Sequence, residues 1–184
     1  RIEAFCWNNI GEDARQRSEW FEALEAYRKA RRLWQLSDDR NVVIAKINEV
    51  LSEIGKGQLT ASSEQLRRLE DGCKNAGYHF LLPVLHLVTA YRAAQEEKIG
   101  AWSQHFEEAK ASIEKMGSID GDIAWVSQQN ASKLDKLGFN EEARRAAGLA
   151  IEQLQRLGRT SKAELMADEY GIDFNPEDLD SPDD

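Results

Sequence analysis

The side chains best suited to catalysis or metal binding in this chain are its histidines. His79 and His86 lie seven residues apart, which places them on one face of a helix, and His105 follows further along the chain. A metal site or a general base would need Cys, Asp or Glu beside them at ligand spacing, and the sequence shows none. We therefore predict structural or surface histidines, and neither a metal nor a cofactor.

Two short motifs resemble ligand-binding or modification sites, but we expect structural roles for them. The sequence SIDGD, residues 118–122, places two carboxylates around a glycine but lacks the remaining ligands of a calcium loop, so we expect helix-capping acids. The sequence NAS, residues 130–132, matches a glycosylation acceptor but falls in the middle of an expected helix. No phosphate-binding glycine loop and no nucleophile motif occurs, so we predict that the chain is not an enzyme.

The cysteines point to a cellular location. Cys6 and Cys73 are far apart and form no CxxC pair, which is typical of small buried thiols in a reducing compartment. We accordingly predict two buried cysteines and a cytoplasmic protein. No apolar run reaches the roughly 18 residues of a membrane span, so we expect no membrane association. Because the chain begins with Arg1 and shows no signal-peptide pattern, we expect a fragment of a longer protein or a processed chain.

The negative charge is concentrated at the C-terminus. The chain of 184 residues has a formal net charge of −9. Residues 161–184 contain nine acidic residues and one lysine, so residues 1–160 are nearly neutral. A nearly neutral body has no broad positive surface for phosphate backbones, and we predict no binding to nucleic acid.

The elements that must position these residues are helices. Apolar residues recur at intervals of three and four along most of the chain, and strand patterns are almost absent. The pattern predicts eight helices joined by short turns that contain glycine, and then a ninth, shorter helix. The expected ranges are 3–17, 19–35, 44–54, 60–76, 79–97, 101–116, 121–137, 141–157 and 161–170. Short turns imply that successive helices run antiparallel.

The helices recur as pairs. Equivalent small or apolar positions at Ala30, Leu69, Ala109 and Ala150 are separated by 39, 40 and 41 residues. A period of this size indicates stacked helical hairpins, none of which can bury its apolar face alone. We therefore predict an all-α solenoid over residues 1–171 and a disordered acidic tail over residues 172–184. The expected repeats are 4–37, 41–77, 79–117 and 121–158, followed by a capping helix at 161–170.

The first pair resembles a tetratricopeptide repeat (TPR). That family has the pattern W-x2-L-G-x2-Y, then A-x3-F-x2-A, then P. The residues that fit the pattern are Trp7, Ile10, Gly11, Trp20, Ala23, Tyr27 and Ala30. Ala14 stands where the family has an aromatic residue, and Gln35 stands where it has proline. The resemblance implies that the small residues lie where helices touch closely.

The fourth pair resembles the same pattern more loosely. Gly138, Ala143 and Ala150 fit it, whereas Asn130 and Ala131 replace its Leu-Gly. Only the apolar stripe and the period support the two middle pairs. The period exceeds the usual 34 residues, as in the longer TPR variants of kinesin light chains and of bacterial signalling and transcription regulators. The resemblance implies a right-handed superhelical stack of about four helix pairs.

TPR proteins bind their partners on a concave face lined by the first helix of each pair. The resemblance places six side chains of this chain on that face. They are Phe5, Asn8, Glu12, Arg15, Asn48 and Ser52. Members that hold a chaperone's C-terminal carboxylate have Lys and Asn at the places of Asn8 and Glu12, and Glu12 would repel a carboxylate. We therefore exclude the chaperone-binding subclass.

The sequence predicts a non-catalytic protein-interaction module of a larger regulatory or scaffolding protein, with another protein or a peptide as its partner. One alternative is a homo-oligomerisation or ligand-sensing arm of a signalling or transcription regulator. Another is an enzyme with an unrecognised helical site, which would require His79 and His86 to converge with a carboxylate. The tail is either a solubilising linker or an acidic arm that binds a basic partner or the chain's own groove through Ile172, Phe174 and Leu179.

Overall fold

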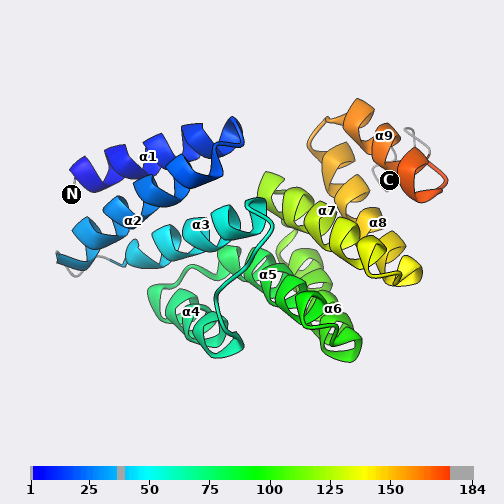
Figure 1. Ribbon diagram of the computed structural model, residues 1–184, viewed down its shortest axis with the longest axis horizontal. Coiled ribbons are helices and arrows are strands. Elements are labelled where there is room, and N and C mark those ends of the chain that lie inside the picture. The colour runs from blue at the N-terminus through cyan, green and yellow to red at the C-terminus, as the bar shows by residue number, and fades with distance from the viewer. Residues whose placement is uncertain (1, 37–39, 175–184) are drawn as a thin grey trace. The chain divides into compact units, whose positions relative to one another are not determined.

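The computed structural model describes residues 2–36 and 40–174 of the chain (Figure 1). Its helices are α1 (Ile2–Gln16), α2 (Trp20–Leu36), α3 (Val42–Gly55), α4 (Ser63–Ala76), η1 (His79–Leu81, a 3-10 helix), α5 (Leu82–Gln95), α6 (Ile99–Met116), α7 (Gly121–Lys136), α8 (Asn140–Arg156) and α9 (Thr160–Tyr170). These described residues contain no strand, so the predicted all-α fold class is confirmed for them. Most of the predicted tail, from residue 175 onward, lies outside the described residues.

Local sequence signals determine where several helices begin and end. At the start of α4, Ser62 Oγ accepts a 3.2 Å hydrogen bond from the Gln65 backbone N–H, and the Gln65 side chain accepts one of 2.8 Å from the Ser62 N–H. Gly77 ends α4 with φ of 75°, in the left-handed region that favours glycine. Asp120 caps α7 by accepting a 2.6 Å hydrogen bond from the Asp122 N–H. This confirms that the SIDGD motif caps a helix.

The chain divides into two compact units, residues 1–81 (unit 1) and residues 82–184 (unit 2). In unit 1, α1 packs against α2, α2 against α3, and α3 against α4. In unit 2, α5 pairs with α6 and α7 with α8, while α5 also packs against α7 and α9 against α8. The boundary falls inside the predicted third repeat, between η1 and α5. A continuous solenoid over residues 1–171 stays a prediction.

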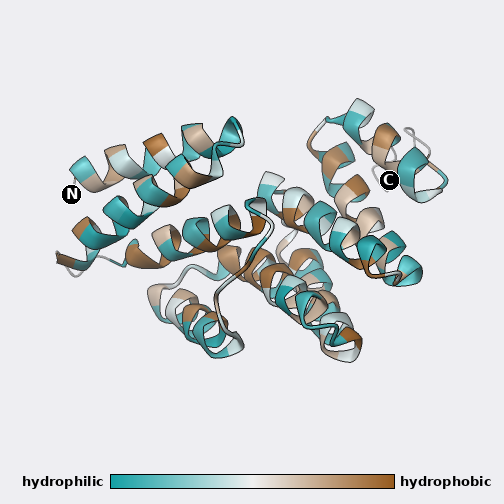
Figure 2. Ribbon diagram, in the orientation of Figure 1, coloured by the Kyte–Doolittle hydropathy of each residue, from teal (hydrophilic) through white to brown (hydrophobic). Residues whose placement is uncertain are grey.

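Small side chains allow close packing in unit 1. Ala4 of α1, Ala30 of α2 and Ala45 of α3 are buried in one cluster with Trp34. Because none of the three alanines projects beyond Cβ, helices from the first and second predicted repeats approach one another around the indole. Figure 2 shows hydrophobic residues as brown bands that recur along the helices.

A buried polar side chain joins three helices of unit 2. Asn130 of α7 is fully buried, and its Oδ1 accepts a 3.0 Å hydrogen bond from Trp102 Nε1 of α6. Its Nδ2 donates to the backbone oxygen of Leu87 in α5 at 3.1 Å and to that of Val126 in its own helix at 2.9 Å. A side chain enclosed in this way cannot accept a glycan in the folded chain, so the NAS motif is structural.

Two aromatic rings of α6 stack on each other next to the buried Asn130 amide. Trp102 and Phe106 of α6 stack with their centroids 4.8 Å apart. The guanidinium of Arg145 in α8 lies 5.3 Å from the Trp102 centroid and 5.6 Å from that of Phe106, and it donates a 2.6 Å hydrogen bond to Glu107 Oε1. Arg145 therefore holds α8 against α6 through both cation–π contacts and an ion pair.

The two cysteines differ, in contrast to the prediction that both are buried. Cys73 of α4 is buried, as expected, but Cys6 is exposed on α1. The prediction is wrong for Cys6 because it lies on the outer face of α1, beside the exposed side chains of Ile2, Phe5 and Ile10.

This difference predicts unequal thiol reactivity. Burial, together with the nearby Glu70 carboxylate, raises the pKa of Cys73 to about 11, so at pH 8 only about one thiol in a thousand is ionised. We expect Ellman's reagent at pH 8 to modify one thiol per folded chain within minutes and both thiols in denaturant. The Cys6→Ser variant should lose the fast phase. A fast phase that persists in that variant would contradict the burial of Cys73.

No helix within the described ranges is both long enough and apolar enough to span a membrane.

Candidate functional site

The residues predicted to line a groove in α1 mostly contact neighbouring side chains. Phe5 is 47% exposed, and its ring meets Trp34 edge to face with centroids 5.3 Å apart. Glu12 accepts a 2.9 Å hydrogen bond from the Tyr27 hydroxyl and forms a 2.5 Å ion pair with Arg15. Glu12 and Arg15 therefore help to hold α1 on α2, and Phe5 remains partly available at the surface.

The remaining predicted groove residues join α1 to α3. Asn48 Nδ2 donates a 3.2 Å hydrogen bond to Asn8 Oδ1, so the two amides satisfy each other between the helices. Ser52 is fully buried, and its hydroxyl donates a 2.8 Å hydrogen bond to the Asn48 carbonyl one turn earlier. The prediction that Ser52 faces a groove is wrong, because this backbone bond satisfies the hydroxyl and allows it to be buried.

The residues predicted to pack the repeats lie at close helix contacts in unit 1. A Cβ atom added at Gly11 would lie 2.6 Å from Tyr27 Cε1, and Ala23 is buried in the same cluster as Tyr27. Trp20 lies against Gly55 at the end of α3, where an added Cβ would overlap its indole. Trp7 packs at the edge of the cluster around Ala30, with the Lys29 ammonium 4.1 Å from its ring centroid.

The predicted packing residues of the fourth pair lie in unit 2. Gly138, in the turn between α7 and α8, has φ of 82°. Ala143 and Ala150 are buried in α8, which packs against α7 and α9. Their small side chains allow both neighbouring helices to approach α8 closely.

Two of the three histidines converge on one carboxylate, which the sequence did not reveal. His105 Nδ1 lies 3.0 Å and His86 Nδ1 lies 3.7 Å from Glu108 Oε2, whereas His79 is exposed in unit 1. Burial raises the pKa of Glu108, but hydrogen bonds from Gln104 and His105 outweigh this effect and leave it below its usual value. The carboxylate therefore stays ionised at neutral pH as an acceptor for the imidazoles.

The cluster residues His86, His105 and Glu108 line neither of the pockets described below. Within residues 2–36 and 40–174, no three His, Cys, Asp or Glu side chains are grouped so that they could hold a metal ion. The cluster serves as a polar contact between α5 and α6.

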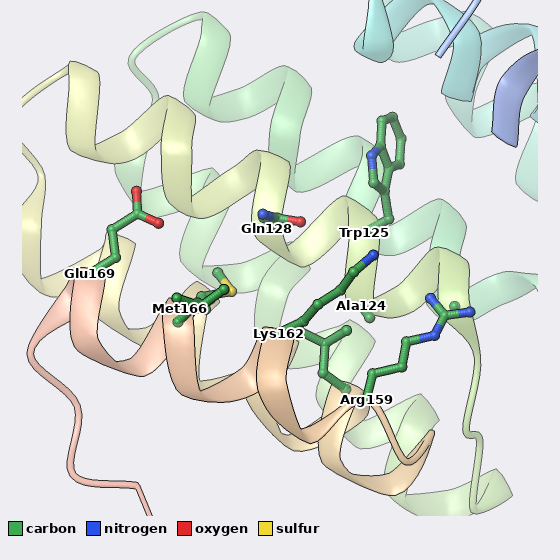
Figure 3. Close-up of a pocket in the computed structure, with 10 residues that line it drawn as sticks. Ala124, Trp125, Gln128, Arg159, Lys162, Met166 and Glu169 are labelled. Atoms are coloured by element: carbon green, nitrogen blue, oxygen red, sulfur yellow. The ribbon is translucent and has the colours of Figure 1, made fainter. Parts of the chain in front are cut away.

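A pocket of about 300 Å³ lies between α7 and α9 in unit 2 (Figure 3). Ala163, Met166 and Ala167 form the buried stripe of α9, which packs against α8. A second row of residues lies along one edge of this stripe and faces α7. Residues three and four positions apart lie on the same face of a helix. Lys162, Leu165 and Glu169 follow that spacing, and all three line the pocket. We call this cavity the α7–α9 pocket.

The two walls of the α7–α9 pocket differ in character. The α7 wall carries the half-buried indole of Trp125 and the exposed amide of Gln128. The α9 wall carries Leu165, which is 71% exposed, and Lys162, which reaches toward α7 beside Trp125 (Figure 3). Arg159 lines the pocket just before α9 begins. The pocket thus combines apolar surface with positive charge at the N-terminal end of α9.

The cations of this pocket are not neutralised by the described part of the chain. Neither Arg159 nor Lys162 forms an ion pair with a residue in 2–36 or 40–174. Glu169, the carboxylate that lines the pocket, lies seven residues from Lys162, which is about 10 Å along the helix. Positive charge therefore dominates at one end of the α7–α9 pocket and negative charge at the other.

A second pocket, of about 500 Å³, lies between α3 and α4 in unit 1. Two of the cations that line it already have partners within the chain. Arg31 Nε lies 2.6 Å from Glu49 Oε1, and Arg68 Nε lies 2.8 Å from Glu64 Oε1. Burial raises the pKa of Glu49, while Arg31 partly offsets this effect, as expected for an internal ion pair. This pocket offers a ligand less unpaired charge than the α7–α9 pocket.

No protein-family model matches this chain. No curated protein and no solved structure has significant similarity to it either. The resemblance to TPR proteins therefore rests on the residues of the sequence and stays a prediction.

Proposed function

We propose that this chain is a non-catalytic protein-interaction module that binds a peptide segment of another protein in the α7–α9 pocket. The observation that carries this proposal is the chemistry of the pocket wall. Leu165 is 71% exposed beside a half-buried Trp125, and both lie next to Arg159 and Lys162, which form no ion pair with another described residue. Exposed apolar side chains gathered at a concave site and bordered by charge are typical of surfaces that bind partners.

The TPR-like architecture is part of this proposal. If α7 and α9 are the first helices of successive pairs in a right-handed superhelix, the pocket between them lies on the concave face, where TPR proteins bind their partners. The order of packing in unit 2, with α5 against α7 and α9 against α8, is compatible with such a stack. We further propose that the module belongs to a larger regulatory or scaffolding protein of the cytoplasm.

Peptide selection followed by calorimetry tests the proposal. We expect random 12-residue peptides selected on the full chain to contain a bulky apolar residue next to Asp or Glu. Lys162→Glu should weaken the best peptide about tenfold, because it reverses a charge in the pocket. Leu165→Ser should weaken it about fivefold, because it removes apolar contact area. Isothermal titration of each variant measures these changes.

Lys115→Glu provides the matched control, because Lys115 is also exposed but lies at the end of α6 and does not line the pocket. This variant should bind the selected peptide as tightly as the unchanged chain does. If no peptide is enriched, or if the two pocket variants bind as tightly as the control, the α7–α9 pocket is not the binding site.

Self-association is a second candidate, which the outer face of α1 favours. Ile2 and Phe5, three residues apart on α1, are 82% and 47% exposed, and Ile10 of the same helix is 48% exposed. Light scattering coupled to size exclusion on the same preparations distinguishes the two functions. A concentration-independent monomer supports the peptide-binding module, whereas a dimer that dissociates in a Phe5→Ser variant would favour oligomerisation.

A further inference from the structure

The pocket between α3 and α4 in unit 1 has the size and floor of a small-molecule site. Its volume is about 500 Å³, and we call it the α3–α4 pocket. Val43 and Val50 of α3 and Leu66 and Leu69 of α4 line it. Val50, Leu66 and Leu69 are at most 8% exposed, so the floor consists of aliphatic side chains. Cavities of about 300–1,000 Å³ with an apolar lining and a few polar groups commonly hold small molecules.

The contact between the two helices determines how the walls of the α3–α4 pocket face each other. The helices α3 and α4 run in opposite directions (Figure 1). A Cβ atom added at Gly72 of α4 would lie 3.3 Å from Val43 Cγ2, at the start of α3. Lys46 lies one turn along α3 from this contact and Arg68 one turn back along α4, and both line the pocket. The two cations therefore lie on opposite walls at about the same level.

The hydrogen-bond acceptors of the pocket wall already receive bonds from within the chain. Glu49 Oε1 accepts a 2.6 Å hydrogen bond from Arg31 Nε, and Glu53 Oε2 accepts one of 2.8 Å from the Thr60 backbone N–H. Gln65 Oε1 accepts the capping bond at the start of α4. Donor groups on a ligand would compete with these existing bonds.

The cationic donors of the same wall can accept a further partner. The Lys46 ammonium is exposed and forms no ion pair or hydrogen bond with a residue that the structure describes. Arg68 donates from Nε to Glu64, and its Nη groups form no hydrogen bond within the described part of the chain. Three cationic side chains line the pocket against two carboxylates, which leaves one net positive charge. A matching ligand therefore supplies an anionic acceptor.

We propose that the α3–α4 pocket binds a small amphipathic carboxylate, that is, a molecule with an aliphatic chain and one anionic end. The carboxylate accepts hydrogen bonds from Lys46 and Arg68, and the chain lies against the aliphatic floor. A single carboxylate matches the net charge of the lining, whereas a phosphate monoester carries nearly two negative charges at pH 7. The lining extends along α3 from Val43 to Glu53, about 15 Å, which favours an elongated ligand.

This site adds a ligand to the peptide binding proposed for unit 2 and does not depend on it, since the α3–α4 pocket belongs to unit 1. Methyl-detected nuclear magnetic resonance of the full chain, titrated with decanoate below its micelle concentration, tests the proposal. We expect the methyl resonances of Val43, Val50, Leu66 and Leu69 to shift and those of unit 2 to stay unchanged. Shifts confined to unit 2 would overturn the assignment of the site.

Ligands with the same chain and a different end test the need for a carboxylate. Decanol and decyltrimethylammonium should each bind about tenfold more weakly than decanoate, because neither brings an anionic acceptor to the two cations. Decanol that binds as tightly as decanoate would show that the pocket selects only an apolar chain. Decyl phosphate that binds more tightly than decanoate would replace the carboxylate by a phosphate and overturn the proposed class of ligand.

A variant of the exposed Lys46 tests the predicted contact without disturbing the floor of the pocket. Lys46→Gln should weaken decanoate about fivefold and leave the affinity for decanol unchanged, a difference that a general change in packing would not produce. Lys46→Arg should keep most of the affinity. Lys115→Gln is the matched control, because Lys115 is also exposed but does not line the pocket. If Lys46→Gln binds decanoate as tightly as this control does, Lys46 does not hold the carboxylate and the proposal is wrong.

Discussion

Replacing Asn130 by alanine is expected to lower the free energy of unfolding of unit 2 by about 3 kcal/mol. The variant removes the acceptor of the Trp102 indole N–H and leaves that donor buried without a partner. An unsatisfied buried donor costs about 1–3 kcal/mol, and the lost amide adds a small cavity. The backbone oxygen of Leu87 also loses its bond from Asn130 Nδ2.

Urea unfolding monitored by circular dichroism and by tryptophan fluorescence measures this loss. Asn9→Ala provides the control, because Asn9 is exposed on α1 and should change the stability by less than about 0.5 kcal/mol. Asn130→Leu restores apolar volume but still leaves the indole N–H unpaired, so it should recover only part of the loss. An Asn130→Leu variant as stable as the unchanged chain would show that the hydrogen bonds contribute little.

The helices could be predicted from the sequence because their signals are local. Periodic apolar residues place each helix, and Gly77 and Gly117 end α4 and α6 with positive φ, as an αL cap requires. Asp120 caps α7 through a neighbour only two residues away. None of these features depends on a distant part of the chain.

The burial of individual side chains could not be predicted as well. Successive helix residues differ in direction by about 100°, so an error of one position moves a side chain to another face. Ser52 was assigned to a groove but is buried, because its own helix satisfies its hydroxyl. Cys6 is predicted to be buried but is exposed on α1.

The candidate site could not be predicted, because it depends on contacts between distant segments. Trp125 and Lys162 are 37 residues apart in sequence, and neither belongs to a motif. The one local signal was Leu165, an apolar residue beside the buried stripe of α9. The contact between His86 and Glu108 was missed for the same reason, since it joins two helices, whereas His105 and Glu108 have ordinary helical spacing.

The first repeat provides the clearest test of a contact that was predicted from sequence. Gly11→Ala is expected to destabilise unit 1 by about 2 kcal/mol, although alanine favours a helix over glycine by about 1 kcal/mol. The added Cβ would lie 2.6 Å from Tyr27 Cε1. Tyr27 is fully buried and its hydroxyl is bonded to Glu12, so the ring has little freedom to move away.

Gly148→Ala is the matched control, because Gly148 is inside α8 and has open space where the new Cβ would lie. That variant should gain up to about 1 kcal/mol from helix propensity alone. The opposite signs of the two changes, measured by urea unfolding, separate packing from propensity. If Gly11→Ala stabilised the chain as Gly148→Ala does, α1 and α2 would not approach as closely as Tyr27 and Gly11 indicate. The small residue would then have no role in packing the first repeat, and the TPR resemblance would lose its most specific support.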